Sequence, residues 1–363
     1  MKIKQSLIIF LLLLILFHSG TGQGTDSGTR RPGTAAAIGL QPGRSLNRLM
    51  AVGDLNFSGI EKRLIADPGY PWAGTKAVLQ SATLLFGNQE SPFTGRGSVY
   101  VPKKWLLRSD PRTVRSLVAA GFDLVTLANN HMLDYGPLGL EDTLFTLRQA
   151  RIAHAGAGMN QAAARKAVVL TGNDGRRFAF LAYSQTFPAE FWATASRPGT
   201  AHGDPAIFTA DIQKAKAVAD EVIVAFHWGE ELKTAPLAYQ KDFAHWCIDA
   251  GAALVVGHHP HVLQGLEVYH GGLIAYSLGN FLFASYSRQC SDSIILAVDF
   301  DRRGPVRAKL YPVNVDNYQV AFQTQLRHGP DAERVIHDLR KGSAEFKTVI
   351  HYRDNIGTIE IRK

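Results

Sequence analysis

The chain has 363 residues, of which 46% are hydrophobic and 19% are charged. This composition is ordinary for a soluble globular protein and predicts one large domain with a sizeable core. The formal net charge of +8 suits an anionic polymer or surface, or simply a solvated basic face, and no cluster of basic and aromatic residues points to nucleic acid. The two cysteines, Cys247 and Cys290, exclude a disulfide framework, and we expect buried thiols.

The first residues have the layout of an export signal. Lys2 and Lys4 precede the apolar run Leu7–Phe17, and small polar residues follow it up to Gly22. The run is short for a bilayer span, which takes about 20 residues. We therefore predict a signal peptide over residues 1–22, with an uncleaved N-terminal anchor as the alternative. Either one places the protein in the periplasm or at the cell surface.

Residues 23–46 are rich in Gly, Thr, Ala and Arg without a hydrophobic period, which predicts a flexible linker. The folded domain then extends over residues 47–320. Short apolar runs in it predict strands buried on both faces. These runs are Leu49–Val52, Thr83–Phe86, Leu124–Ala128, Val222–Phe226, Leu254–Val256 and Leu273–Tyr276.

Helical patterns separate several of these runs. One is predicted from Asp110 to Gly121, with Leu117 and Val118 among its inward residues, and another from Pro236 to Ala250, with Trp246 and Cys247 on its core face. Turn residues predict two hairpins, Val168–Tyr183 and Ser293–Val315. Residues 321–363 form a C-terminal extension with a helical pattern near Ala332–Arg340 and a strand pattern at Gly357–Ile361. The mixture predicts an α/β fold.

Polar side chains follow all six of the predicted strands. They are Asp54, Glu90, Asn130 with His131, His227, the trio His258, His259 and His261, and Asn280. Each one alone would be read as a turn residue, a cap or a hydrogen-bonded core group. Together they indicate a site, because the carboxyl ends of the strands in an α/β sheet meet at one crevice.

This mixture of side chains suits divalent metal ions. Carboxylates such as Asp54 and Glu90 lower the charge of a metal pair and can bridge it, while imidazoles and amide oxygens complete the ligand shells. Pro260 interrupts the strand between His259 and His261, which lets both rings point to one side. We predict two divalent metal ions, from among Mn, Zn and Fe.

Several longer strings carry a resemblance to a known family. They are "LANNHMLDYG" (Leu127–Gly136), "FHWGEE" (Phe226–Glu231), "VVGHHPHVLQ" (Val255–Gln264) and "YSLGNFLF" (Tyr276–Phe283), together with Gly53-Asp54 and Asn88-x-Glu90-Ser-Pro92. In this order they resemble the CapA-type family of bacterial poly-γ-glutamate capsule synthesis proteins, from about Leu49 to Val315. The resemblance implies a calcineurin-like metallophosphoesterase fold, a four-layer sandwich of two mixed β-sheets flanked by helices.

The resemblance also implies roles for the residues at matching positions. The metal ligands would be Asp54, Glu90 as the bridging carboxylate, Asn130, His227, and two among His258, His259 and His261. His131 would act in catalysis as the general acid. Asp54 would take part in catalysis as the first-motif metal ligand. Two positions depart from the phosphoesterase pattern, since Asn56 stands where that pattern has His, and Glu90 stands where it has Asp.

Two functions are compatible with these residues. The first is an exported metal-dependent hydrolase or transferase that acts on an anionic polymer or a phosphoester. The second is a non-catalytic accessory protein that binds anionic polymer beside membrane capsule-synthesis proteins. No Gly-rich phosphate cradle supports ATP-driven ligation by this chain alone.

Other side chains have secondary predicted roles. Asp134 and Asn280 are expected to orient histidine ligands, and Tyr100 and the Lys103-Lys104 pair are expected to touch an anionic substrate. We predict that Trp228 packs in the core and that Glu230 and Glu231 are solvated, with the alternative that either one lines the crevice.

Overall fold

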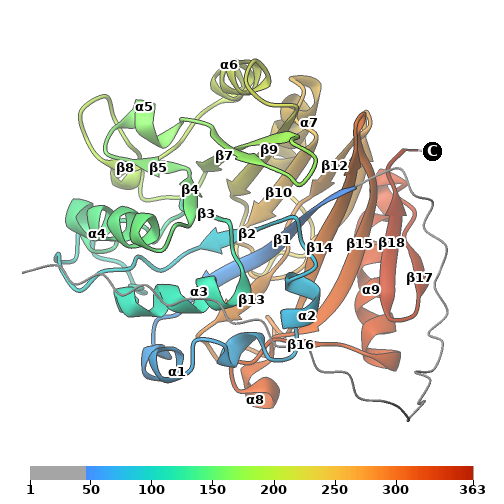
Figure 1. The fold of residues 1–363 in the computed structure, drawn as a ribbon, viewed down its shortest axis with the longest axis horizontal. Coiled ribbons are helices and arrows are strands. Elements are labelled where there is room, and N and C mark those ends of the chain that lie inside the picture. Colours follow the sequence, from blue (N-terminus) through green and yellow to red (C-terminus); the bar gives the residue numbers. More distant parts are fainter. Residues whose placement is uncertain (1–45, 363) are drawn as a thin grey trace, which may run out of the picture. The chain divides into compact units, whose positions relative to one another are not determined.

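The computed structural model describes residues 46–362, which contain two mixed sheets that face each other (Figure 1). The large sheet has ten strands and the small sheet has six. The large sheet runs β17 (His351–Arg353), β18 (Ile356–Glu360), β15 (Gly304–Asn314), β14 (Asp292–Asp301), β1 (Asn47–Asn56), β2 (Leu84–Gln89), β3 (Leu124–Thr126) and β4 (Ala153–Ala155), with β13 (Asn280–Phe283) beside β1 and β16 (Gln325–Leu326) beside β15. The small sheet runs β11 (Leu266–Tyr269), β12 (Gly272–Ala275), β10 (Leu254–His258), β9 (Glu221–His227), β7 (Arg177–Ser184) and β6 (Val168–Thr171).

All six of the predicted buried strands are present, as β1, β2, β3, β9, β10 and β12. No residue of β1, β2, β9 or β10 is exposed, which explains why their sequences are almost continuously apolar. The parallel series β1–β2–β3–β4 forms one half of the large sheet, and the parallel series β7–β9–β10–β12 forms the middle of the small sheet. Both predicted hairpins are confirmed, as β6–β7 and β14–β15.

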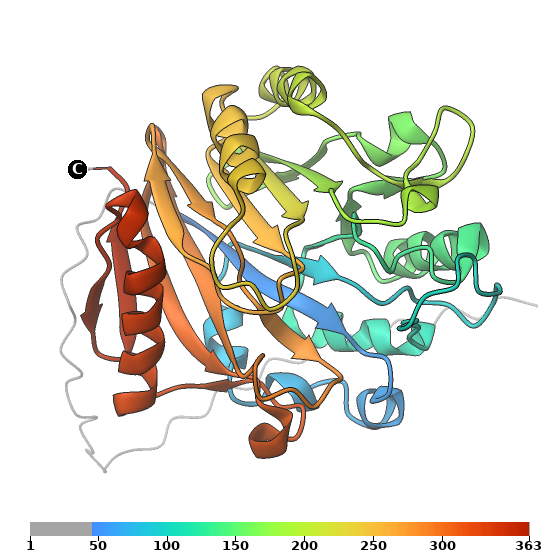
Figure 2. The same ribbon diagram turned by 180° about the vertical axis from the view of Figure 1, so that it is seen from behind.

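Helices cover the outer faces of both sheets (Figures 1 and 2). The helices of the described chain are α1 (Glu61–Ala66), α2 (Lys76–Leu79), α3 (Val114–Ala120), α4 (Gly136–Gln149), α5 (Gln161–Ala164), α6 (Pro205–Lys216), α7 (Ala238–Asp249), α8 (Asn317–Val320) and α9 (Gly329–Ser343). A short two-stranded sheet pairs β5 (Ala157–Gly158) with β8 (Gly199–Thr200).

Apolar side chains fill three layers between these elements. Between the sheets, Phe86 of the large sheet packs with Phe180 of the small sheet, with their ring centroids 5.4 Å apart. Leu117 of α3 and Leu140 of α4 pack on the outer face of the large sheet, and α6 and α7 cover the small sheet in the same way. The helix–sheet–sheet–helix order confirms the predicted four-layer fold.

Two helix faces differ from the prediction. Leu117 is buried, but Val118 is 52% exposed, because Ser116 and Ala120 share the face of the short helix α3 that meets the sheet. In α7, Cys247 is buried as predicted, whereas Trp246 is 44% exposed.

The C-terminal residues extend the same core. β18 pairs with β15, and β17 pairs with β18, so both lengthen the large sheet. Helix α9 buries Val335, Ile336 and Leu339 in the apolar layer between the two sheets. Residues 329–361 therefore pack directly on the strands of the folded domain.

The predicted signal segment, residues 1–22, and the predicted linker up to residue 45 lie outside the described residues. Between residues 46 and 362, the chain contains no helix that is both long enough and apolar enough to cross a membrane. Both cysteines are free and buried, as predicted.

Candidate metal centre

The carboxyl ends of the central strands bring the predicted side chains together. Asp54 at the end of β1 lies opposite Asn88 of β2 and Asn280 of β13, and His227 at the end of β9 lies opposite His258 of β10. The backbones at the ends of β10 and β12 lie so close together that one of them requires glycine. A Cβ on Gly257 would lie 1.9 Å from the carbonyl oxygen of Tyr276.

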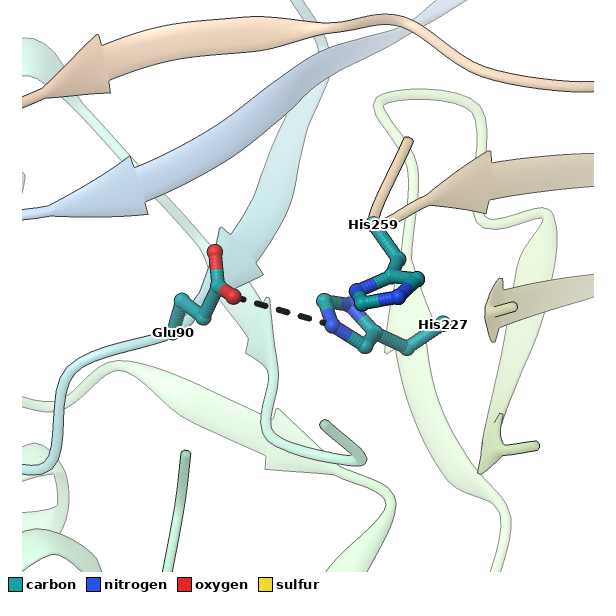
Figure 3. Close-up of side chains that lie close together, drawn as sticks. All are labelled: Glu90, His227 and His259. Atoms are coloured by element: carbon teal, nitrogen blue, oxygen red, sulfur yellow. Dashed lines mark ion pairs between the residues drawn. The ribbon is translucent and has the colours of Figure 1, made fainter. Parts of the chain in front are cut away.

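Three groups of side chains in the described chain have the geometry to hold a cation. In each group, one ligand atom from each residue lies within 4.8 Å of the others. The groups are Glu90 with His227 and His259, Asp54 with Glu90 and His261, and Glu231 with His259 and His261. Figure 3 shows the first group, with the Glu90 carboxylate facing the rings of both histidines. Glu90 belongs to two of the groups, as a bridging ligand would.

Glu90 is a buried carboxylate without a hydrogen-bond partner. Its exposed fraction is 0%, and within the described residues neither carboxylate oxygen accepts a hydrogen bond. The Nε2 atoms of His227 and His131 lie 3.7 and 3.8 Å from Oε1. Burial raises the pKa of Glu90 from 4.5 to about 8. Such a group is costly unless a cation or a proton compensates its charge.

His259 presents a second orphan atom at the same place. Its Nδ1 is buried and has no hydrogen-bond partner in the part of the chain that the structure describes. Burial lowers the pKa of His259 to about 3, so the ring is neutral at physiological pH. A neutral imidazole beside an unpaired carboxylate is a donor set that Zn, Mn and Fe accept. The residues present therefore fit a divalent metal ion.

Asp54 is held more firmly than Glu90. Its Oδ1 accepts a hydrogen bond from Asn88 Nδ2 at 2.8 Å, and its Oδ2 accepts one from the backbone N–H of His259 at 3.2 Å. Burial alone would raise the pKa of Asp54, but the contact with His261 and the hydrogen bond from Asn88 keep it below the ordinary value. Asp54 is therefore held in place as an anion, which suits a cation ligand.

His227 is fixed through both ring nitrogens. Nδ1 lies 3.3 Å from the amide nitrogen of Asn88, and Nε2 lies 2.9 Å from Asn130 Oδ1. Burial, and then the nearby His259, lower the pKa of His227 well below its usual value. The ring is therefore neutral, which is the form that binds metals. Asn130 thus places its amide oxygen beside the first ligand group, at the position that the sequence predicts.

The structure distinguishes the members of the histidine trio. His259 and His261 flank Pro260 and have φ values of +93° and +60°, which non-glycine residues rarely adopt and which concentrate at functional sites. Both rings join candidate ligand groups. His258 instead points its Nε2 at the carbonyl oxygen of Val52, 3.1 Å away, and belongs to none of the groups found within residues 46–362. The geometry favours His259 and His261 as the ligands.

The predicted orienting residues contact their histidines. Asn280 Oδ1 lies 2.8 Å from Nδ1 of His261, and Asp134 Oδ2 lies 2.7 Å from Nδ1 of His131. Burial lowers the pKa of His131, and Asp134 opposes that shift. A ring that donates Nδ1–H to Asp134 presents its Nε2 lone pair toward Glu90.

Lys103 contacts residues of the site directly. Its Nζ forms an ion pair with Asp134 Oδ1 at 2.6 Å and donates to the backbone carbonyl of Asn130. Lys103 therefore holds the His131–Asp134 pair in place, and its contact with an anionic substrate stays a prediction. Burial lowers the pKa of Lys103, and Asp134 opposes that shift.

Glu231 is exposed, as predicted for a solvated residue, and it also belongs to the third candidate ligand group. The backbone N–H of Leu232 donates to the carbonyl of Pro260 at 2.9 Å, which ties the loop after β9 to the histidine loop. The "FHWGEE" string marks this loop, but only the contact between the two loops reveals which glutamate faces the histidines. Trp228 is fully buried and stacks on Phe226, as predicted for packing.

Asn56 does not replace the missing first-motif histidine. Its Oδ1 accepts a hydrogen bond from the backbone N–H of Ser58 at 3.0 Å and closes a turn of its own loop. Asn56 is buried, and this hydrogen bond already occupies its side-chain oxygen.

The four-layer α/β fold gathers this cluster of carboxylates and histidines at the carboxyl ends of its central strands. A family model described as "Bacterial capsule synthesis protein PGA_cap" matches residues 48–285, and the chain belongs to this family. It is 33% identical to "Capsule biosynthesis protein CapA" of Bacillus anthracis, over 81% of this chain and 73% of that protein. It is 34% identical to "PGA biosynthesis protein CapA" of Bacillus subtilis, over 66% of this chain and 63% of that protein.

Two solved structures have a similar arrangement of elements. A phosphatase from Mycoplasma pneumoniae aligns over 77% of this chain and 98% of its own, with a TM-score of 0.48 and 15% identity. The NAD nucleotidase of Haemophilus influenzae aligns over 82% of this chain and 63% of its own, with a TM-score of 0.45 and 11% identity.

Proposed function

We propose that the protein is an exported, metal-dependent hydrolase or transferase that acts on an anionic polymer or a phosphoester during capsule synthesis. One observation carries the proposal. The Glu90 carboxylate is fully buried, accepts no hydrogen bond within residues 46–362, and faces histidines at the ends of two other strands. A purely structural carboxylate is normally buried only together with hydrogen-bond partners. A carboxylate that bridges metal ions instead needs both of its oxygens free for those ions.

The residues that would hold the metal ions are Asp54, Glu90, Asn130, His227, His259 and His261. Divalent ions bound there act as Lewis acids on a phosphoryl or carbonyl oxygen. Asp54 and Glu90 supply the negative charge that offsets the ions, and the neutral rings and the amide add ligands without adding charge.

His131 would move the proton of the reaction. Its Nε2 borders the cluster, 3.8 Å from Glu90 Oε1. With Nδ1–H directed at Asp134, Nε2 first accepts a proton, and the ring serves as the predicted general acid only in that protonated form. Lys103 and Asp134 hold the ring in place during both steps.

The names of the relatives support the choice of substrate. Proteins 33% and 34% identical to this chain are described as capsule and PGA biosynthesis proteins. We take the polymer to be poly-γ-glutamate, a chain of carboxylates, and its partners to be membrane capsule-synthesis proteins. Export would depend on residues 1–22, either as a cleaved signal or as an anchor.

A specific observation favours the second candidate function, an accessory protein that binds polymer without turnover. Asn56 closes a turn instead of supplying an imidazole, so the cluster has one histidine fewer than the phosphoesterase pattern. The same crevice could then hold polymer carboxylates through a bound cation.

The test combines metal analysis with turnover. Purified protein is measured for bound Mn, Zn and Fe and assayed with bis(p-nitrophenyl) phosphate, beside Asp54→Ala, His131→Ala and, as a control at an exposed turn, Asp354→Asn. We expect Asp54→Ala to lose metal and turnover, and His131→Ala to keep metal while turnover falls about 100-fold or more. Melting curves should show both variants folded.

The outcomes separate the candidates. An absence of both metal and turnover in the wild type would support the accessory role. Unfolding of Asp54→Ala or His131→Ala would make these residues structural and would end the site assignment.

A further inference from the structure

A second polar feature lies away from the metal centre, where the edges of the two sheets meet. β4 is an edge strand of the large sheet, and β6 is an edge strand of the small sheet. A cavity of about 580 Å³ lies beside them and is lined by residues from 148–157 and 163–169. Its lining begins before β4, whereas Asn130 and His131 follow β3, which runs parallel to β4. Within the described chain, no residue of the candidate ligand groups belongs to the lining of this cavity.

The cavity is lined by cations that nothing in the described chain neutralises. The side chains of Arg148, Arg151 and Lys166 are exposed and have no ion pair or hydrogen bond with any residue from 46 to 362. No carboxylate belongs to the described lining. Burial, and then the charge of Arg148, lower the pKa of His154, so this ring adds a neutral polar group to the wall. Unpaired cations around one hollow favour an anionic ligand.

The positive surface continues into an adjoining hollow. A cavity of about 460 Å³ shares Lys166 and Ala167 with the first and adds Lys214, whose Nζ lies 3.8 Å from Asp211 Oδ1. The guanidinium of Arg165 also lies there, but Asp211 holds it in two hydrogen bonds of 2.8 and 2.9 Å. Lys166 therefore lies between two hollows, with unpaired arginines on one side. We call this pair of hollows the edge groove.

The lining of the edge groove suits a polymer better than a small anion. Its charges are distributed along two adjoining cavities, so one phosphate would reach only some of them. Between the cations the wall is apolar, with Ile152, Ala157 and Val168. A flexible chain that carries repeated carboxylates on a methylene-rich backbone offers both kinds of contact.

We propose that the edge groove binds a polycarboxylate chain and so gives the protein a second polymer contact, separate from the metal centre. The identification of that chain as poly-γ-glutamate rests on the proposed function. The groove itself depends only on the unpaired cations and the two cavities. Bound there, the polymer would be held by several weak contacts at once, so binding should weaken strongly with salt.

The test compares two triple variants of the full chain with the same change in charge. The groove variant is Arg148→Gln/Arg151→Gln/Lys166→Gln. The control is Lys62→Gln/Lys76→Gln/Arg115→Gln, which removes exposed cations near α1, α2 and α3 that likewise have no ion pair within residues 46–362. Binding of fluorescently labelled poly-γ-glutamate is followed by anisotropy, with inorganic phosphate, free glutamate and single-stranded DNA as competitors.

We expect the Kd of the groove variant to rise about tenfold or more and that of the control to change less than about twofold. Metal content and phosphodiester turnover should stay at wild-type levels in both. An equal loss in the two variants, or no loss in the groove variant, would overturn the proposal. Competition by phosphate or DNA as strong as that by unlabelled poly-γ-glutamate would do so as well.

The two proposals fail in different ways. A wild-type protein without metal-dependent turnover but with weaker polymer binding in the groove variant would end the catalytic proposal and leave the groove in place. The reverse pattern would end the groove proposal alone.

Discussion

At the scale of single residues, Glu90 shows how function and stability oppose each other. Its carboxylate has no hydrogen-bond partner in the described chain, and burial raises its pKa from 4.5 to about 8. Because the folded state prefers the protonated form, this group stabilises the metal-free protein fully below about pH 4.5. That contribution is lost as the pH rises through about 8.

We therefore predict that Glu90→Gln changes the pH dependence of stability. Without metal, the melting temperature of the wild type should fall relative to that of Glu90→Gln as the pH rises from about 5 to about 8. Excess Mn²⁺ or Zn²⁺ should stabilise only the wild type, because the variant lacks the bridging ligand. Calorimetry in EDTA and in metal checks both statements. Parallel curves for the two proteins in EDTA would contradict the account.

Asp134 should act on catalysis through His131. Its carboxylate orients the ring at 2.7 Å without joining a ligand group of the described chain. We expect Asp134→Asn to lower kcat about 10- to 100-fold and to leave metal content unchanged. Steady-state kinetics beside Asp354→Asn gives the comparison, and a loss of metal in Asp134→Asn would assign it a different role.

The side-chain types at the site could be predicted from the sequence, but some of the partners could not. The apolar runs are followed within a few residues by Asp54, Glu90 and His227, and this spacing can be read from the sequence alone. The choice among His258, His259 and His261 depends on two left-handed residues around Pro260. The places of Lys103 and Glu231 depend on contacts between loops far apart in the chain.

At the scale of elements, the strand ends position the ligands only because their backbones approach closely. The missing side chain of Gly257 leaves room for the carbonyl of Tyr276 and the indole nitrogen of Trp228, which would lie 1.9 and 2.4 Å from a Cβ. We predict that Gly257→Ala lowers the free energy of unfolding by about 1–3 kcal/mol or more. Gly95→Ala is the control, since a Cβ there meets no atom of the described residues within 4 Å.

Urea denaturation measures both glycine variants. Equal stability of Gly257→Ala and Gly95→Ala would show that the end of β10 has more room than the structure indicates. If metal affinity falls in Gly257→Ala but not in Gly95→Ala, the close approach at the end of β10 also positions the loop that carries His259 and His261.

The strands were predictable because burial on both faces leaves an unbroken apolar run, as in β1, β9 and β10. Helix faces were less predictable. In a seven-residue helix such as α3, a shift of one residue decides whether Val118 faces the sheet, and packing against the sheet decides that shift.

At the scale of the whole molecule, the C-terminal helix completes the core between the sheets. Leu339 of α9 is 2% exposed and lies in the central apolar cluster, whereas His337 on the same helix is exposed. We predict that Leu339→Ala lowers the free energy of unfolding by about 2–5 kcal/mol. His337→Ala should change it by less than about 0.5 kcal/mol. Chemical denaturation tests this, and equal effects would mean that α9 docks only loosely.

The same reasoning applies to removal of all residues from Gly329 onward. A chain that ends before Gly329 loses α9 and β18 and exposes the apolar faces that they cover. We expect such a chain to lose cooperative unfolding and near-ultraviolet circular dichroism. A cooperative transition like that of the full chain would show that the strands of residues 47–320 form a complete core by themselves.

The most direct measurement of the metal centre is anomalous diffraction from crystals of the full chain grown with Mn²⁺. The account predicts a peak within bonding distance of Glu90, His227 and His259, a second one beside Asp54 and His261, and neither in Glu90→Gln crystals. Anomalous peaks confined to surface carboxylates, or an empty cluster in wild-type crystals soaked in excess Mn²⁺, would contradict it.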